Sequence, residues 1–293
     1  TIAPFYLRVF LSSLLLLMFS SVLIGQGVWS PVKRPSEGDL VSVFFTSENR
    51  GFIGGDSGYF AITENGGSSW NQINLTTNDN VNEIYFRNDD NGYLLVGKRI
   101  FISNDSGRSW RESRALLTTE LNGLTPEFLS VRFSSKNRGW IVGGLANKDD
   151  EIVESLIMQT RDSGETWSRV LIPEKTELFH VDFANDDNGW IVGDQGVIYR
   201  TTDGGNSWVK LDSGTTESLY NVDFRDSKNG IVVGGRGTIL RTENGGLNWQ
   251  KISSDATKSL LRVSFVNDKT GWIVGAGGMV LRTEDRGRTW QRQ

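Results

Sequence analysis

The residues of this chain that could do chemistry stand in a short pattern that occurs six times. The pattern, Ser/Thr-x-Asp/Asn-x-Gly-x-Ser/Thr-Trp, is called the box below, and only Asn248 departs from it. Acidic or amide side chains in six equivalent places could indicate metal binding or acid–base catalysis. The copies span residues 63–70, 103–110, 160–167, 201–208, 242–249 and 283–290.

Each residue type of the box also has a local structural reason. The Asp or Asn can accept backbone N–H bonds as in an Asx-turn, the Gly permits a positive φ, and the Trp carries a large apolar surface into the packing. Catalytic carboxylate pairs must lie within about 5–10 Å of each other, whereas identical turns spread along the chain cannot converge. We therefore predict hairpin turns, with no catalytic residue, metal or cofactor.

The elements that must position the boxes are short strands, which recur with a period of about 40 residues. A first strand has the form Leu-x-x-Val-x-Phe, as in 219–224, and a second has the form Gly-Trp-Ile-Val-Gly, as in 189–193. A third strand leads into the box and a fourth begins at its Trp. Four short strands in each repeat are typical of a β-propeller.

The number of repeats predicts the size of the ring. Six complete four-stranded units are present, and Trp29-Ser-Pro-Val resembles the strand that follows each box. We expect an all-β, seven-bladed type of propeller over residues 28–293, in which Trp29 begins the outer strand of a seventh blade and the sequence is clipped at its C-terminus. The alternative is a complete six-bladed ring with a redundant Trp29 strand.

The N-terminal segment predicts export. An apolar run over residues 9–24 follows Arg8, and small residues follow at Gly25 and Gly27. We interpret residues 1–27 as a secretory signal peptide, because the run is shorter than the roughly 20 residues of a spanning helix. A membrane anchor is the alternative. The expected location is the periplasm, the thylakoid lumen or the exterior of the cell.

Composition excludes several classes of function. The net charge of −4 provides no basic field for nucleic acid. The chain has no cysteine, which excludes disulfides, thiol catalysis and cysteine-ligated zinc. His180 is the single histidine of the sequence, so a histidine-rich metal site is excluded as well.

Two insertions interrupt the period, within 113–127 and within 144–154. In an up-and-down blade both connections fall on the face opposite the boxes. The second insertion carries Asp149, Asp150, Glu151 and Glu154. Loops often carry function, so we predict that these acidic residues contact a partner. A tolerated surface insertion is the alternative.

Two further sets of polar residues are candidates. Arg200, Arg241 and Arg282 each precede the first Thr of a box; they could pair with box carboxylates or receive a partner's carboxylate or acidic peptide. The first strands line the central channel and carry the second set. We expect these residues to form a polar, hydrated channel, with catalysis as the alternative: His180, Asp182, Asn221, Asp223 and Arg262.

The boxes resemble the bacterial neuraminidase (Asp-box) repeat of sialidases, xyloglucan-active glycosidases and sorting receptors. The whole repeat includes Gly-x-Ile-x-Arg-Thr-x-Asp-Gly-Gly-x-x-Trp, and over residues 29–293 it is similar to the photosystem II stability/assembly factor propellers. This resemblance implies a seven-bladed, non-catalytic propeller. It also implies binding to a newly made reaction-centre subunit on the lumenal side, with an arginine-rich surface involved.

The leading hypothesis is therefore an exported, monomeric scaffold that binds a membrane-complex subunit or another protein. Two alternatives remain. One is an Asp-box glycosidase or sialidase-like enzyme, although no Arg-Ile-Pro-like stretch stands in the first repeat. The other is a propeller that binds a glycan through exposed tryptophans.

Overall fold

The computed structural model describes residues 38–113 and 121–293. The predicted signal peptide over residues 1–27, its membrane-anchor alternative and the Trp29 strand lie outside these ranges, as does part of the first insertion. Within the described ranges no helix has the length and apolar character needed to cross a membrane.

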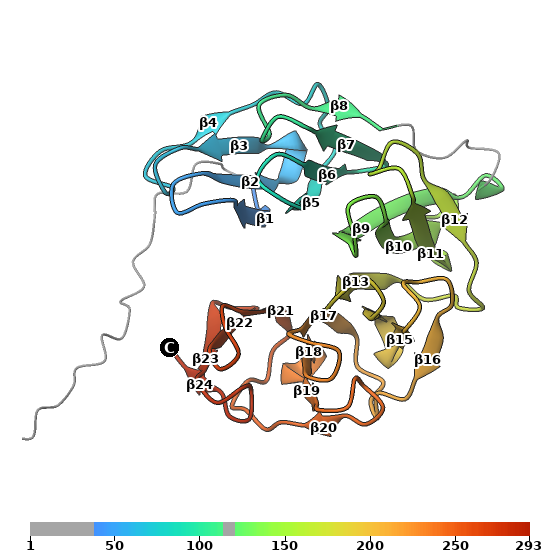
Figure 1. Cartoon of the computed structure of the whole chain (residues 1–293), viewed down its shortest axis with the longest axis vertical. Coiled ribbons are helices and arrows are strands. Elements are labelled where there is room, and N and C mark those ends of the chain that lie inside the picture. Colours follow the sequence, from blue (N-terminus) through green and yellow to red (C-terminus); the bar gives the residue numbers. More distant parts are fainter. Residues whose placement is uncertain (1–37, 114–120) are drawn as a thin grey trace, which may run out of the picture. The chain divides into compact units, whose positions relative to one another are not determined.

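The described chain is all-β and folds into six antiparallel sheets of four strands each, called blades 1 to 6. Within each blade the strands are adjacent in sequence order, with the first strand innermost (Figure 1). Blades 1 to 3 consist of β1 (Leu40–Phe45), β2 (Gly51–Gly55), β3 (Phe60–Thr63), β4 (Asn71–Gln72); β5 (Val81–Phe86), β6 (Gly92–Val96), β7 (Arg99–Ser103), β8 (Arg111–Glu112); β9 (Thr125–Phe133), β10 (Gly139–Ala146), β11 (Ile152–Thr160) and β12 (Ser168–Val170).

Blades 4 to 6 have the same order, and short 3-10 turns follow the second strand in blades 1, 4 and 5. The strands are β13 (Leu178–Phe183), β14 (Gly189–Gly193), β15 (Ile198–Thr201), β16 (Val209–Leu211); β17 (Leu219–Phe224), β18 (Gly230–Gly234), β19 (Ile239–Thr242), β20 (Gln250–Lys251); β21 (Leu260–Phe265), β22 (Gly271–Gly275), β23 (Met279–Thr283) and β24 (Gln291–Arg292). The turns are η1 (Asp56–Gly58), η3 (Asp194–Gly196) and η4 (Gly235–Gly237).

The all-β fold and the four-stranded repeat are confirmed, and the described residues form a six-bladed propeller. The predicted seventh blade is not supported. Every described strand belongs to one of the six sheets, and the strand that led to the prediction lies outside the described residues.

The hydrophobic core lies between consecutive sheets. Between blades 4 and 5, for example, Trp190 and Val192 pack against Val222 and Phe224. The rings of Trp190 and Phe224 are stacked with their centroids 3.4 Å apart. The alternation of the first and second strands therefore buries apolar side chains on both faces of an interior blade.

The first and last blades differ from the interior ones. The inner strands are neighbours in the order β1, β5, β9, β13, β17 and β21, and within the described residues β21 has no comparable contact with β1. Val43 of β1 is 63% exposed and Val274 of β22 is 44% exposed. Blades 1 and 6 thus each have one sheet face that no described blade covers.

Candidate functional site

The box over residues 201–208 is a closed set of hydrogen bonds. The Thr201 hydroxyl donates to Asp203 Oδ1 (2.8 Å) and accepts the Gly205 N–H (2.7 Å). Asp203 also accepts the Ser207 N–H at Oδ1 (2.9 Å) and the Ser207 hydroxyl at Oδ2 (2.7 Å). Both carboxylate oxygens are therefore engaged within the turn.

The first box, which has Asn in the third position, reverses one of these bonds. In the first box Asn65 Oδ1 accepts the Ser69 N–H, but Asn65 Nδ2 donates to the Ser69 hydroxyl (2.9 Å). In the fifth box Asn244 Oδ1 accepts the N–H of Asn248, the residue that departs from the pattern. The bonds to the backbone are common to all six boxes, so the turn requires an acceptor in the third position and no charge.

The hydrogen bonds also stabilise the ionised form of the box aspartates. The Ser207 hydroxyl and N–H lower the pKa of Asp203 to about 2, and Ser109 does the same for Asp105. A carboxylate held in this way is a poor general acid or base near neutral pH. The described residues also contain no group of three or more His, Cys, Asp or Glu side chains that could hold a metal ion.

The boxes of blades 2 to 6 also bind the blade before them. The carbonyl of its fourth residue accepts a hydrogen bond from the preceding blade in five consecutive blade pairs, over distances of 2.6–3.4 Å. The donors are Arg, Tyr or Trp side chains. The pairs are Arg50 with Ser106, Tyr93 with Ser163, Arg138 with Gly204, Trp190 with Gly245, and Arg241 with Arg286.

The glycine in the fifth position of the box allows this close approach. A Cβ on Gly205 would lie 2.1 Å from the Trp140 ring of blade 3, and a Cβ on Gly107 would lie 2.6 Å from Phe52 of blade 1. Both glycines have positive φ, 80° and 76°. The box is therefore a fastener between blades as well as a hairpin turn.

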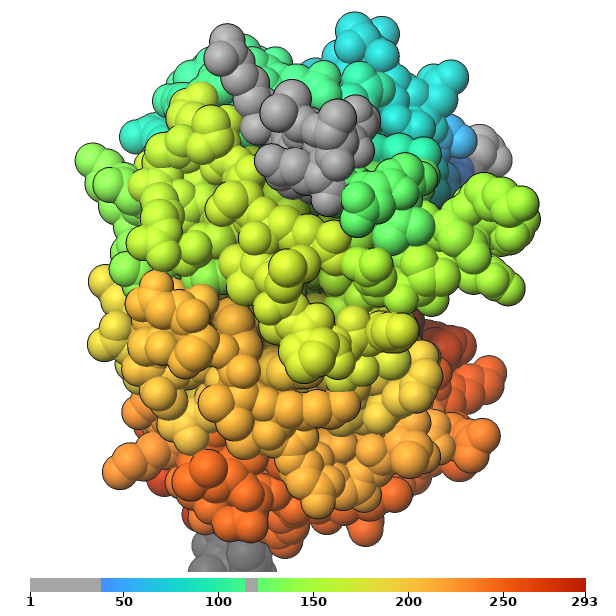
Figure 2. Space-filling view, turned by 90° about the vertical axis from the view of Figure 1, so that its right-hand side faces the viewer, coloured from blue at the N-terminus to red at the C-terminus, as the bar shows by residue number. Residues whose placement is uncertain are grey.

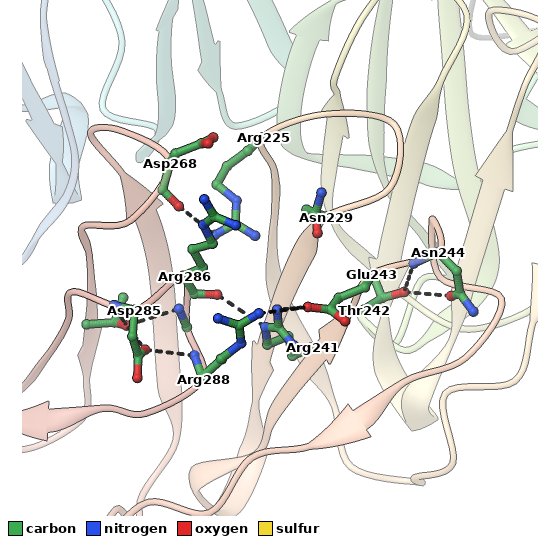
Figure 3. A network of polar contacts seen from close by, with 12 residues as sticks. Arg225, Asn229, Arg241, Thr242, Glu243, Asn244, Asp268, Asp285, Arg286 and Arg288 are labelled. Carbon is green, nitrogen blue, oxygen red and sulfur yellow. Dashed lines mark hydrogen bonds and ion pairs between the residues drawn. The ribbon is translucent and has the colours of Figure 1, made fainter.

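The row of arginines before the last three boxes is packed into the fold. Arg241 is buried, donates to the Arg286 carbonyl and pairs with Glu243 (Figure 3). Arg282 pairs with Glu284 at 2.5 Å and exposes 24% of its side chain. Arg200 lies over the Trp190 ring at 5.8 Å. Each guanidinium thus has a partner within the chain.

The channel-lining residues of blades 4 to 6 come together around one cavity. The third and fifth residues of a first strand lie on the same side, two residues apart. His180, Asp182, Asn221, Asp223 and Arg262 occupy these positions and line a cavity of about 570 Å³. Val41, Val43 and Val274 form an apolar part of its wall.

Several of these polar side chains satisfy the backbone of the next blade. Asp182 Oδ2 accepts the Phe224 N–H (2.8 Å), and Asp223 Oδ2 accepts the Phe265 N–H (2.9 Å). Four residues, each three positions before the Phe that ends its first strand, accept an N–H from the following first strand: Ser42, Glu83, Ser130 and Asn221. Neighbouring inner strands are not paired through their backbones, so side chains supply the acceptors that buried N–H groups require.

Sequence reasoning missed two residues of this channel, Glu83 and Arg132. Glu83 is 1% exposed and accepts from Arg132 Nη1 at 2.9 Å, while Arg132 Nη2 lies 2.8 Å from His180 Nε2. Arg262 reaches the same Glu83 carboxylate at 3.5 Å. The repeat alignment could have identified both residues. Glu83 occupies the strand position that His180 occupies in blade 4, and Arg132 occupies the position of Asp182.

Burial dominates the electrostatics of the cavity. It raises the pKa of Asp223 to about 7, with a further rise from the neighbouring Asp182, whose own pKa is raised by burial. Burial, together with the Arg132 and Arg262 guanidinium groups, holds the pKa of His180 well below its usual range. The imidazole is therefore neutral at physiological pH.

The second insertion extends blade 3 beyond its neighbours. Strands β9 to β11 have eight or nine residues, and the tip of the hairpin projects at the right of Figure 2. Asn147 Oδ1 accepts the N–H groups of Asp149 (2.8 Å) and Glu151 (3.0 Å), which fixes the turn. Asp149 and Asp150 are exposed, whereas Glu154 pairs with Arg169 at 2.5 Å.

Six four-stranded blades fastened by these boxes define an Asp-box β-propeller. The model of the family described as photosynthesis system II assembly factor YCF48 matches residues 68–176 and 206–293, and the chain belongs to this family. The predicted relationship to the photosystem II assembly factor propellers is thereby confirmed.

Curated relatives carry the corresponding names. The chain is 24% identical over 175 residues to the chloroplastic photosystem II stability/assembly factor HCF136 of Arabidopsis thaliana, covering 59% of this chain and 38% of that protein. It is 27% identical over 175 residues to the photosystem II assembly lipoprotein Ycf48 of a Picosynechococcus species, covering 59% and 46%. The chain thus spans less than half the length of these relatives.

Solved structures share the fold. A structure titled "YCF48 bound to D1 peptide" matches with a TM-score of 0.70 and 18% identity, covering 90% of this chain and 83% of that one. An ancestral GH74 enzyme matches with a TM-score of 0.68 and 16% identity, covering 87% and 37%. Propellers with this architecture therefore include both an assembly factor and an enzyme.

Proposed function

We propose that this propeller is a non-catalytic scaffold that binds a subunit of a membrane complex during its assembly. The family and the named relatives support this role. The observation that carries it is the extended hairpin of blade 3, because it offers exposed acidic residues on a fixed turn. We call Asp149, Asp150, Glu151 and Glu154 the acidic lip.

The acidic lip suits a basic or hydrogen-bond-donating segment of a protein. Its turn is held by Asn147, so binding costs little conformational entropy. Of the row formed by Arg200, Arg241 and Arg282, Arg241 is buried and is not accessible to a partner. Arg282, with 24% of its side chain exposed, is the member of this row with which we propose contact.

A peptide titration tests the proposed partner class. One related structure is titled as a complex with a D1 peptide, so we propose a D1 peptide as the probe. The double variant Asp149→Asn, Asp150→Asn should weaken binding by about fivefold, because rim charges steer a partner of opposite charge. Asp226→Asn, on the box face of blade 5, should leave binding unchanged. If the unmodified chain does not bind the peptide, a D1-like partner is contradicted. If the double variant binds as well as the unmodified chain, the acidic lip is not the contact surface.

The enzyme alternative is a xyloglucan-active propeller, because structures with this fold include a GH74 xyloglucanase. In this chain Asp182 and Asp223 each hold a backbone N–H of the next blade with one oxygen. We propose that this bridging is their role and that xyloglucan and sialosides are not hydrolysed. Turnover that disappears in Asp223→Asn would contradict this assignment. Glycan binding without turnover remains a second candidate, tested on the same substrates by calorimetry.

We also propose export and a further blade. The relatives named as a lipoprotein and as chloroplastic support an exported or lumenal location. The uncovered faces of blades 1 and 6, with Val43 and Val274 exposed, support a blade that packs between them in the parent protein. A monomer is expected once those faces are covered, and sedimentation of the parent protein tests this.

A further inference from the structure

Each of the six described blades has a β-bulge in its first strand. The register with the second strand shifts four positions before the Phe that ends the first strand, so the residue at this position has no partner across the ladder. A bulge redirects the side chain of the extra residue and is often found beside a binding site. The bulged residues are Val41, Asn82, Leu129, Phe179, Tyr220 and Leu261.

The bulged residues of blades 3 to 5 present large apolar or aromatic side chains that the core does not use. Leu129, Phe179 and Tyr220 are half-buried, and the hydrophobic clusters between the described blades do not include them. The rings of Phe179 and Tyr220 contact each other across blades 4 and 5, with centroids 5.3 Å apart. Blades 3 to 5 have a neighbouring blade on both sides, so this exposure does not depend on a further blade. We call these three residues the apolar row.

The apolar row lies at the rim of the central channel, on the face opposite the boxes. The boxes bond to the turns that follow the first strands, as the Gly204 N–H does to the Asp187 carbonyl (2.9 Å). The bulges stand near the other end of the same strands, which are the innermost strands of the blades (Figure 1). Exposed apolar residues with a polar surround are typical of a protein contact site.

Carboxylates stand beside the apolar row. Glu127 and Glu177 each precede a bulged residue by two positions, so they lie at most about 7 Å from it along the chain. The N–H of Asp194 donates to the Glu177 carbonyl (2.8 Å). Burial, followed by the Glu127 and Asp194 carboxylates, raises the pKa of Glu177 to about 7. No cationic group of the described residues opposes this rise.

The two features together select one kind of partner. A basic side chain offsets the repulsion among the carboxylates, and an apolar side chain covers the apolar row. In an extended peptide, side chains two residues apart point to the same side and lie about 6–7 Å apart. The same separation holds between Glu177 and Phe179, which are also two residues apart.

We propose that this rim binds an extended protein segment with a basic residue two positions from an aromatic or large apolar one. The basic side chain contacts Glu127 and Glu177, and the apolar side chain packs on Phe179 and Tyr220. The proposal rests on the proposed scaffold function for the existence of a protein partner. It assigns to that partner a contact surface separate from the acidic lip.

Calorimetric titration of the intact chain with the peptide acetyl-Ala-Arg-Ala-Phe-Ala-amide tests the proposal. The peptide should bind with a Kd below about 1 mM. Two analogues, one with Gln in place of Arg and one with Ala in place of Phe, should each bind at least about fivefold more weakly, because each leaves one feature without its partner. If the peptide does not bind, or if either analogue binds as well as the peptide, the proposal is overturned.

Binding should also release protons near neutral pH. A cation beside Glu177 favours its ionised form, and a group with a pKa of about 7 is about half protonated at pH 7. Up to about 0.5 proton should therefore leave for each peptide bound. Titrations in two buffers with different ionisation enthalpies measure this number. Glu177→Gln should abolish the release, and peptide binding without any release at pH 7 contradicts the contact with Glu177.

Matched variants locate the surface. Phe179→Ala and Tyr220→Ala should each weaken peptide binding by at least about fivefold. The controls Leu247→Ala and Glu64→Gln change exposed residues of boxes and should leave binding unchanged. The double variant of the acidic lip should alter it by less than about twofold. Equal binding by the two rim variants contradicts the assigned surface. The scaffold function itself is decided separately, by the titration with the D1 peptide.

Discussion

Strands β14 and β22 have the same sequence, Gly-Trp-Ile-Val-Gly, and opposite surroundings. In β14 every residue is buried, and Trp190 stacks on Phe224 and donates to the Gly245 carbonyl of the next box (2.9 Å). In β22 Trp272 is half-buried and lies beneath Arg282. The local sequence determines that both segments form strands. The presence of a following blade determines how much the tryptophan of each strand contributes to stability.

Truncation of the two tryptophans should give the largest contrast. Trp190→Ala removes a ring that is fully buried between blades and should lower the free energy of unfolding by about 3–5 kcal/mol. Trp272→Ala should lower it by less than about 2 kcal/mol. Chemical denaturation of both variants provides the measurement. Equal losses would contradict this contrast and would show that the outer face of blade 6 is covered in solution.

The glycines of two boxes provide a second, smaller contrast. Gly205 and Gly67 have similar φ values, 80° and 86°. A Cβ on Gly205 would meet Trp140 of the preceding blade at 2.1 Å, whereas a Cβ on Gly67 would meet Trp70 of its own box at 3.4 Å. Because the backbone strain is shared, Gly205→Ala should destabilise the chain by about 1–3 kcal/mol more than Gly67→Ala. Thermal unfolding of the pair measures the difference. Equal costs would mean that the box does not anchor to the preceding blade.

The smallest effect should be the loss of stability at acidic pH that the aspartate of one box causes. The folded pKa of Asp203 is lowered to about 2, so its contribution is present above the unfolded pKa and lost as the pH falls towards 2. Asp203→Asn retains the acceptor, as Asn244 does in the fifth box. The stability difference between the unmodified chain and this variant should therefore shrink between about pH 4 and pH 2. Urea titrations at several pH values measure this difference. If the difference does not change with pH, the ionisation of Asp203 does not contribute to it.

The sequence predicted the repeat well because its signals are local. The Leu-x-x-Val-x-Phe pattern corresponds to β13, β17 and β21, and the box residues bond mainly within one turn. The contacts that organise the site are not local. Arg138 reaches the Gly204 carbonyl across 66 positions, and no pattern near Arg138 indicates this bond.

The channel was only partly predictable for the same reason. His180, Asp182 and Asp223 stood out as polar residues in apolar strands, but their partners belong to other blades: His180 contacts Arg132, and the two aspartates accept backbone N–H groups of the following blade. The arginine row shows the limit most clearly. The sequence allowed either internal pairing or partner contact, and the burial of Arg241 follows from its position against the sixth box.

The side-chain acceptors of the first strands give the ring a direction. Each of blades 1 to 5 accepts backbone N–H groups of the blade that follows it and donates to a box carbonyl of that same blade. In blade 4, Asp182 accepts the Phe224 N–H and Trp190 donates to the Gly245 carbonyl of blade 5. Neither interaction needs a particular residue: Ser42, Glu83 and Asn221 are equivalent acceptors, and Arg, Tyr and Trp side chains are equivalent donors to the box carbonyls. A duplicated blade therefore carries both the acceptors and the donors that its contacts with neighbouring blades require. Such a protein can gain or lose blades by unequal recombination without new interface residues.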